Sequence, residues 1–169
     1  KEFIPGGERA TEKDYLEQIE MSAISAFLAV EYNKQRKNGR APIRFLSSFV
    51  ALEESTSTLY FVEPPLPMGG AKGFKKYCDN VGGWEIDLFD PTLAEFALFT
   101  YEATRGYMMV MDLQGSPRTK EGEYVLTDPA ILCSDVLRFG STNLGEMIMK
   151  RCVLSIRNLL EARAESWKV

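Results

Sequence analysis

Hydrophobic and polar positions alternate along this chain with two different periods, one helical and one typical of strands. Apolar residues recur at helical spacing in three stretches, 11–32, 91–106 and 143–160. Thr11 followed by acidic residues is typical of a helix start, and the polar run 33–40 would end the first helix. The pattern therefore predicts three helices, of which the first and last are long.

Strand patterns fill the stretches between these helices. Apolar residues in 43–52 and 58–63, separated by the polar turn 53–56, predict an antiparallel hairpin. Residues 107–111 form a continuous apolar run of strand length, which predicts a strand buried on both faces. Together the elements predict an α+β fold.

A proline- and glycine-rich connector, residues 64–70, interrupts the pattern after the hairpin. Proline fixes the backbone where a strand must stop, and glycine frees it again. Such a connector suits a hinge between two subdomains, which would comprise residues 1–63 and 71–169.

Composition narrows the possible functions. The chain has 169 residues, 45% of them hydrophobic, enough for one domain with a core. Its formal net charge of −4 argues against nucleic-acid binding, and it has no apolar run long enough to cross a membrane. Three widely spaced cysteines predict neither a disulfide framework nor a zinc ribbon, so a reducing, cytoplasmic setting is expected.

Because the chain contains no histidine, acid–base or metal chemistry must use other side chains. Asp112 and Gln114 flank Leu113, so in an extended segment both would point to one side while Leu113 points to the core. A carboxylate and an amide projecting together can bind a divalent cation or a phosphate-bound cation. The alternative is an ordinary strand end with a turn at 115–117.

Asp128 lies between Thr127 and Pro129, and the proline predicts that Asp128 is held extended. Two acids around one cation are the usual way to hold magnesium beside a nucleotide. Asp128 is therefore a candidate magnesium ligand, or a general base toward a hydroxyl. The alternative is an Asp-Pro turn.

Two further candidates flank this region. The run from Gly140 to Gly145 leads into the last helix, where exposed amides can bind an anion; the alternative is a loop in which Asn143 caps the helix. Glu63 ends a strand before two prolines, and a buried acid there would accept a hydrogen bond from an adenine amine. The alternative for Glu63 is a solvated strand end.

Taken together and in this order, these sequence motifs resemble those of the alpha-kinase family of atypical serine/threonine protein kinases. The matching segments span nearly the whole chain: 1–5, 60–64, 73–77, 100–102, 105–106, 112–115, 126–131 and 139–145. The resemblance implies a protein-kinase-like fold, mainly the C-lobe and hinge with part of the N-lobe. Residues 1–63 would be the partial N-lobe, 64–70 the hinge and 71–169 the C-lobe.

The resemblance also implies roles for single residues, with ATP and magnesium as cofactors. Lys1 would contact the nucleotide phosphates and Glu63 the adenine. Asp112 and Gln114 would hold magnesium and the phosphates and take part in catalysis.

Catalysis and substrate binding are assigned to the second half of the chain by the same resemblance. Asp128 matches the catalytic aspartate of the family. Gly140, Asn143 and Gly145 match the glycine-rich loop near the protein substrate.

The family's structural zinc site is not matched. Its ligands are a histidine before the Thr-Tyr-Glu segment and a His-x-Cys-x-x-x-Cys run in the last helix. The corresponding positions hold Leu98, Ile156, Asn158 and Ala162. We therefore expect no zinc, and apolar packing in its place.

The leading hypothesis is transfer of phosphate from magnesium ATP to a protein serine or threonine, by a domain of a larger chain or assembly. The competing hypothesis is a catalytically inactive pseudokinase that serves as a binding or scaffold module. A third is an unrelated nucleotide-binding α+β enzyme, which a cluster of Asp112, Gln114 and Asp128 below Glu63 would argue against.

Overall fold

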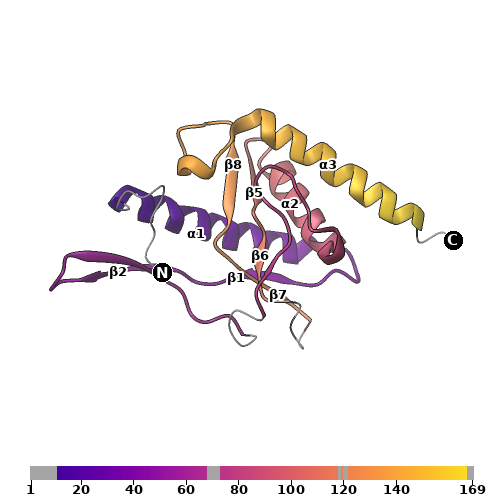
Figure 1. Ribbon diagram of the computed structural model, residues 1–169. Helices are drawn as coiled ribbons and strands as arrows, with labels where there is room; N and C mark the ends of the chain where they lie inside the picture. Colours follow the sequence, from indigo (N-terminus) through magenta and orange to yellow (C-terminus); the bar gives the residue numbers. More distant parts are fainter. Residues whose placement is uncertain (1–10, 68–72, 118, 120–121, 167–169) are drawn as a thin grey trace.

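The computed structural model describes residues 11–67, 73–117, 119 and 122–166, and Figure 1 shows their arrangement. Three α-helices lie in these ranges: α1 (Glu12–Gln35), α2 (Pro91–Ala103) and α3 (Gly145–Ser166). The strands are short: β1 (Ile43–Phe45), β2 (Phe49–Glu53), β3 (Thr58–Val62), β4 (Lys75–Lys76), β5 (Met108–Met111), β6 (Gln114–Gly115), β7 (Tyr124–Thr127) and β8 (Ala130–Cys133). The predicted α+β class is confirmed.

Helix α1 begins where the sequence predicts it. The Thr11 hydroxyl accepts a hydrogen bond from the Asp14 amide at 3.4 Å, and the Asp14 carboxylate accepts one from the Thr11 amide at 2.7 Å. This reciprocal capping box satisfies amides that the first helical turn leaves without partners. The helix ends at Gln35, within the polar run.

The single strand expected from residue 43 to residue 52 is two strands. β2 pairs with β3 in the predicted antiparallel hairpin, over five residue pairs from Phe49↔Val62 to Glu53↔Thr58. β1 instead pairs in parallel with β7, and the Leu46 amide continues that ladder to the Leu126 carbonyl at 2.8 Å. Ile43 and Phe45 are buried there, so the start of the predicted strand belongs to the central sheet.

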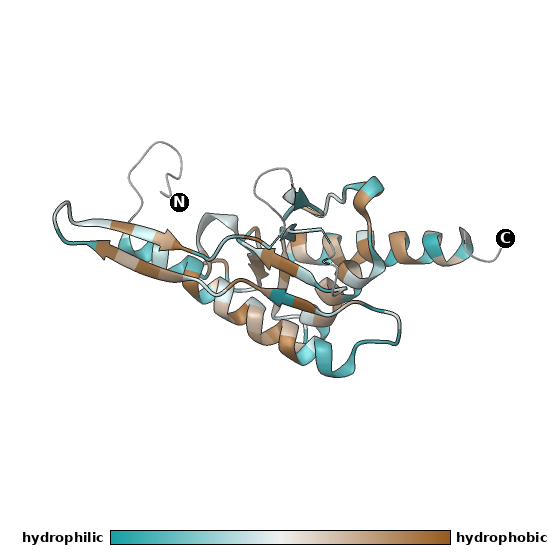
Figure 2. Cartoon of the chain, turned by 90° about the horizontal axis from the view of Figure 1, so that it is seen from below, coloured by the Kyte–Doolittle hydropathy of each residue, from teal (hydrophilic) through white to brown (hydrophobic). Residues whose placement is uncertain are grey.

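The hairpin β2–β3 lies beside α1 and projects from one end of the molecule, opposite the end at which α3 stops (Figure 2). The central four-stranded sheet has the order β1-β7-β6-β4. β5 and β8 form a separate antiparallel pair in which every residue is buried, so the prediction of a buried strand is confirmed for residues 108–111. Tyr107, the first residue of the predicted strand, lies outside β5 and is exposed.

Helix α2 begins with Pro91 after the cap residue Asp90, whose carboxylate accepts a hydrogen bond from the Thr92 amide at 2.7 Å. It ends at Ala103 rather than Gly106, because Arg105 and Gly106 adopt left-handed φ values of +53° and +79°. Helix α3 starts at Gly145, two residues later than predicted. None of the described helices is long and apolar enough to cross a membrane.

Helix α3 packs against α2 and β8 through one apolar stripe. Ile156 is fully buried at the centre of that stripe, whereas Leu154, two residues earlier, is 62% exposed. The buried residues of this stripe therefore hold α3 against α2 and β8.

We expect Ile156→Ala to lower the free energy of unfolding by about 2–5 kcal/mol, because it removes buried methyl groups and leaves a cavity. Urea denaturation would measure the change, with Leu154→Ala as the exposed control and a shift of less than about 0.5 kcal/mol. Equal losses in the two variants would contradict this packing.

Candidate active site

Two antiparallel strand pairs, β5–β8 and β6–β7, follow each other along the same two segments of chain, and both segments are interrupted between the pairs. β5 pairs with β8 as far as Met111↔Ala130, and the ladder resumes between β6 and β7 at Gln114↔Thr127. Each strand is interrupted by two residues, and the first of these is Asp112 on one side and Asp128 on the other. We call these two residues the corner aspartates.

Both corner aspartates adopt a left-handed backbone conformation, with φ of +57° at Asp112 and +51° at Asp128. The extended conformation predicted for Asp128 is therefore wrong. Proline after Asp128 disfavours a helical backbone locally, but the chain must turn here to pass from β7 to β8. Aspartate tolerates this conformation better than most residues, and non-glycine residues in it cluster at functional sites.

Gly115 lets β6 approach β7 closely. A Cβ atom built on Gly115 would lie 2.2 Å from the Val125 carbonyl oxygen, so no other residue fits without moving the strands. Leu113 is fully buried and points to the core, as predicted. The close approach brings the Gln114 side chain within reach of the opposite corner.

The Gln114 amide joins the two corners. Its Nε2 donates to the Asp128 carbonyl oxygen at 2.9 Å and to Asp112 Oδ2 at 3.2 Å. Because both acceptors are oxygens, the amide nitrogen must face them, and the amide oxygen is turned the other way. Asp112, Gln114 and Asp128 thus form one hydrogen-bonded cluster, as expected of a shared site.

Lys76 on β4 supplies a positive charge to this cluster. Its Nζ lies 2.6 Å from Asp112 Oδ1, and the lysine side chain is 52% exposed while that of Asp112 is 21% exposed. The β4–β6 ladder sets this distance, because Lys76 is the direct cross-strand partner of Gln114.

Burial and charge act on Asp112 in opposite directions. Desolvation raises the pKa of the Asp112 carboxyl, and the Lys76 ammonium lowers it without cancelling the increase. The same hydrogen bond raises the pKa of Lys76. A raised carboxyl pKa means that the fold favours the protonated form, so the contribution of Asp112 to stability is lost as the pH rises through that pKa.

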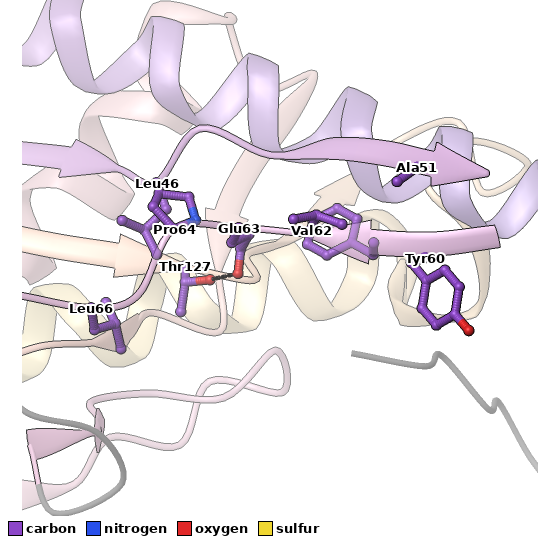
Figure 3. A pocket seen from close by; sticks show the side chains of 9 residues that line it. Leu46, Ala51, Tyr60, Val62, Glu63, Pro64, Leu66 and Thr127 are labelled. Carbon is purple, nitrogen blue, oxygen red and sulfur yellow. Dashed lines mark hydrogen bonds between the residues drawn. The ribbon is translucent and has the colours of Figure 1, made fainter. Parts of the chain in front are cut away.

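Glu63 lies in a pocket next to the cluster. The pocket has a volume of about 530 Å³ and is lined mainly by apolar side chains, among them Leu46, Pro64 and Leu66 (Figure 3). Glu63 Oε2 accepts a hydrogen bond of 2.5 Å from the Thr127 hydroxyl. Since Thr127 immediately precedes Asp128, the pocket and the corner share the end of β7.

Asn143 organises the loop that leads into α3. Its Oδ1 accepts from the amides of Cys133 and Gly145 at 2.8 and 3.0 Å, and its Nδ2 donates to the carbonyls of Asp135 and Arg138 at 2.9 and 3.0 Å. Both the oxygen and the nitrogen of the buried Asn143 side-chain amide are thus hydrogen-bonded to backbone groups. Asn143 also acts as the helix cap that the alternative interpretation expected.

Gly140 lies in the same loop and faces helix α1. It has a φ of +65°, and a Cβ atom there would lie 2.7 Å from the Glu17 carboxylate oxygen. Gly145 begins α3. The structure thus places Gly140, Asn143 and Gly145 in one loop, in which Gly140 lies next to α1.

Two of the predictions concern residues that lie partly or wholly outside the described ranges. Lys1, the candidate phosphate ligand, is not described, and neither are residues 68–70 of the expected hinge.

Sequence reasoning missed two residues that contact the corner aspartates. Lys76 lies in a segment that matched the family, but nothing in the sequence distinguishes it from Lys75. Gln18 on α1 donates from Nε2 to Asp128 Oδ1 at 3.0 Å, across 110 residues of chain. A polar residue on the buried face of the first predicted helix was the only available signal.

The family model of the alpha-kinases matches residues 1–155. The chain belongs to the alpha-kinase family. It is 34% identical over 144 residues to alpha-protein kinase vwkA of Dictyostelium discoideum, covering 83% of this chain and 22% of that protein. It is 31% identical over 143 residues to human transient receptor potential cation channel subfamily M member 7, covering 80% of this chain and 7% of the channel.

Solved structures confirm the alpha-kinase fold. An alpha-kinase from Entamoeba histolytica superposes with a TM-score of 0.75 at 28% identity, covering 86% of this chain and 60% of that one. The alpha-kinase domain of myosin heavy chain kinase A, solved as a complex with ADP, gives 0.73 at 28% identity, covering 86% and 56%. This alpha-kinase chain therefore spans less than two thirds of the solved domains and a smaller part of the curated relatives.

The residues at the family's zinc positions do not fit a zinc ion. Leu98 packs against the core from α2, and Ile156 is fully buried on α3. Asn158 and Ala162 are exposed on the same helix. Zinc in structural sites needs thiolate, imidazole or carboxylate ligands, and none of these four side chains offers one.

Asp112 and Asp128 are the two carboxylates of the corner cluster that could bind a hard divalent cation. The Lys76 ammonium already lies 2.6 Å from Asp112 Oδ1, so a cation at this oxygen would compete with Lys76. Across residues 11–67, 73–117, 119 and 122–166, no three His, Cys, Asp or Glu side chains gather as a metal site. A magnesium ion at the corners would therefore take its remaining oxygens from water and nucleotide phosphates, as this ion commonly does.

We expect Lys76→Met to raise the pKa of Asp112 further, because Lys76 is the positive charge that lowers this pKa within the described part of the chain. Carboxyl-detected NMR titration would measure this pKa. Lys75→Met is the matched control, since neighbouring residues on a strand point to opposite faces. An unchanged Asp112 pKa in Lys76→Met, or an equal rise in both variants, would contradict the ion pair.

Proposed function

We propose that this alpha-kinase domain transfers the γ-phosphoryl group of magnesium ATP to serine or threonine hydroxyls of a protein. The observation that carries the proposal is the cluster in which the Gln114 amide joins Asp112 and Asp128. An apolar pocket with an acid at its edge lies directly beside this cluster. The arrangement supplies both parts that phosphoryl transfer needs, positioning and charge stabilisation.

The nucleotide would bind with its base in the pocket and its phosphates at the corners. Glu63 would accept a hydrogen bond from the adenine amine, as its bond to the Thr127 hydroxyl shows that this carboxylate acts as an acceptor. Complexes of related alpha-kinase domains with ADP and AMP-PNP support a nucleotide here. Lys1 is a candidate second phosphate ligand outside the described residues.

Asp112 would hold the magnesium ion together with Gln114, whose amide would have to turn over to offer its oxygen, because its nitrogen now faces Asp112 and the Asp128 carbonyl. The ion would supply charge neutralisation to the phosphates when bound. Lys76 lies where it can balance the same negative charge. Because its side chain is half exposed, Lys76 would be able to contact a phosphate oxygen instead of Asp112.

Asp128 would act on the acceptor hydroxyl. The hydroxyl oxygen forms a bond to the γ-phosphorus, the bond from that phosphorus to the bridging oxygen breaks, and ADP leaves. The hydroxyl proton passes to the Asp128 carboxylate. The loop containing Gly140 and Gly145, shaped by Asn143, would present backbone groups to the substrate chain.

The setting that we propose is the cytoplasm, with protein substrates and a larger parent chain. Cys78, Cys133 and Cys152 are all buried free thiols, which suits a reducing compartment. Relatives such as myosin heavy chain kinase D are matched over only 15% of their length, so alpha-kinase domains occur within larger chains.

We expect Asp128→Asn to lower kcat of the full-length protein by about 10²–10⁴-fold with little change in KM for ATP, because it removes the proton acceptor and keeps the shape. Transfer of radiolabelled phosphate would measure this. Asp135→Asn is the control, because the exposed Asp135 carboxylate accepts a hydrogen bond from the Leu137 amide, which the side-chain oxygen of asparagine can also accept.

Wild-type transfer by the Asp128→Asn variant would reject the assigned role. Absence of both ATP binding and phosphate transfer in the wild-type full-length protein would favour the scaffold function instead.

A further inference from the structure

One turn of helix α1 contacts both the Asp128 corner and the Gly140–Gly145 loop. Gln18 donates its hydrogen bond to Asp128 Oδ1, and the neighbouring residues reach the loop before α3. The Glu20 carboxylate pairs with the Arg138 guanidinium, and the Thr142 hydroxyl lies 3.9 Å from the Met21 sulfur. Residues 17–21 of α1 therefore link the Asp128 corner to the Gly140–Gly145 loop.

The hydrogen bond from Gln18 to Asp128 is buried and is therefore expected to hold the carboxylate in one orientation. Gln18 is only 5% exposed, so its amide has little access to water as an alternative partner. A carboxylate oxygen can only accept, and hydrogen bonds to charged groups are stronger than those between neutral ones. Losing the Gln18 amide would leave one carboxylate oxygen of Asp128 without its donor from α1.

Asp128 is constrained from three sides. Its backbone carbonyl is held by Gln114, its carboxylate by Gln18, and its left-handed φ by the turn between β7 and β8. The charged groups around it are Asp112, Lys76 through Asp112, and Glu63 through Thr127. Among these contacts, only Gln18 reaches the carboxylate from a helix.

We propose that Gln18 is the residue that orients the Asp128 carboxylate, and that residues 17–21 of α1 thereby set the position of Asp128 relative to the Gly140–Gly145 loop. This inference rests on the proposed function, in which Asp128 accepts the proton of the substrate hydroxyl. Gln18 is a positioning residue in this account, because it acts through Asp128.

The test uses the full-length protein with Gln18→Leu and Gln18→Glu, and Ser22→Ala as the matched control. Ser22 is a buried polar residue one turn further along α1, and within the described part of the chain its hydroxyl has no hydrogen-bond partner. We expect Gln18→Leu to lower kcat about tenfold, a change of ~1.4 kcal/mol, with KM for ATP unchanged.

Gln18→Glu keeps the size of the side chain and places a second carboxylate against Asp128. We expect it to lower kcat at least as far as Gln18→Leu does, with KM for ATP again unchanged, because an ionised carboxylate cannot donate to Asp128 Oδ1 and repels it. A merely structural defect would reduce the folded fraction, which circular dichroism would show, and would not produce a selective loss of kcat.

Combining Gln18→Leu with Asp128→Asn separates this inference from the proposed function. We expect no further loss in the double variant, because residues that act as one unit are not additive. If Asp128→Asn alone were harmless, the proposed function would fail. If Asp128→Asn were damaging but Gln18→Leu behaved like Ser22→Ala, the role of Gln18 would be overturned.

Amide hydrogen exchange tests the same Gln18–Asp128 contact without any measurement of kinase activity. We expect segments 127–131 and 138–142 to exchange several-fold faster in Gln18→Leu than in Ser22→Ala, because both depend on the same turn of α1. Equal exchange in the two variants would overturn the proposal, whether or not the wild-type protein transfers phosphate.

Discussion

The strand pairs β5–β8 and β6–β7 are separated by a two-residue interruption in each chain segment, and each interruption begins with an aspartate in a left-handed conformation. The distance between Asp112 and Asp128 follows from the ladders on either side, β5–β8 above and β6–β7 below. Gly115 permits the close approach of β6 to β7, and Gln114 replaces a lost ladder bond by binding the Asp128 carbonyl. The backbone thereby fixes the site before any ligand binds, which is how a preorganised site lowers a reaction barrier.

The supports of the two corners come from different parts of the fold. Lys76 reaches Asp112 from β4, Gln18 reaches Asp128 from α1, and Thr127 connects the corner to Glu63 in the pocket. These contacts join segments that are far apart in the chain, so the site depends on the packing of α1 against the sheet.

Local features were predictable from the sequence and long-range ones were not. The Thr11 cap, the Pro91 helix start and the buried strand β5 follow from neighbouring residues. The motifs around Asp112 and Asp128 were found through their order and their family resemblance. The parallel pairing of β1 with β7 and the contact of Gln18 with Asp128 depend on tertiary packing, which one sequence does not show. The conformation of Asp128 was mispredicted because the turn between β7 and β8 overrides the local effect of Pro129.

We propose that the two corners form one magnesium–nucleotide site. Isothermal titration calorimetry of the full-length protein with ATP, in magnesium and then in EDTA, tests this most directly, with Asp112→Asn as the comparison. We expect that magnesium tightens ATP binding in the wild type and that Asp112→Asn abolishes this gain. ATP binding that is equally tight in magnesium and EDTA, or a gain that persists in Asp112→Asn, would contradict it.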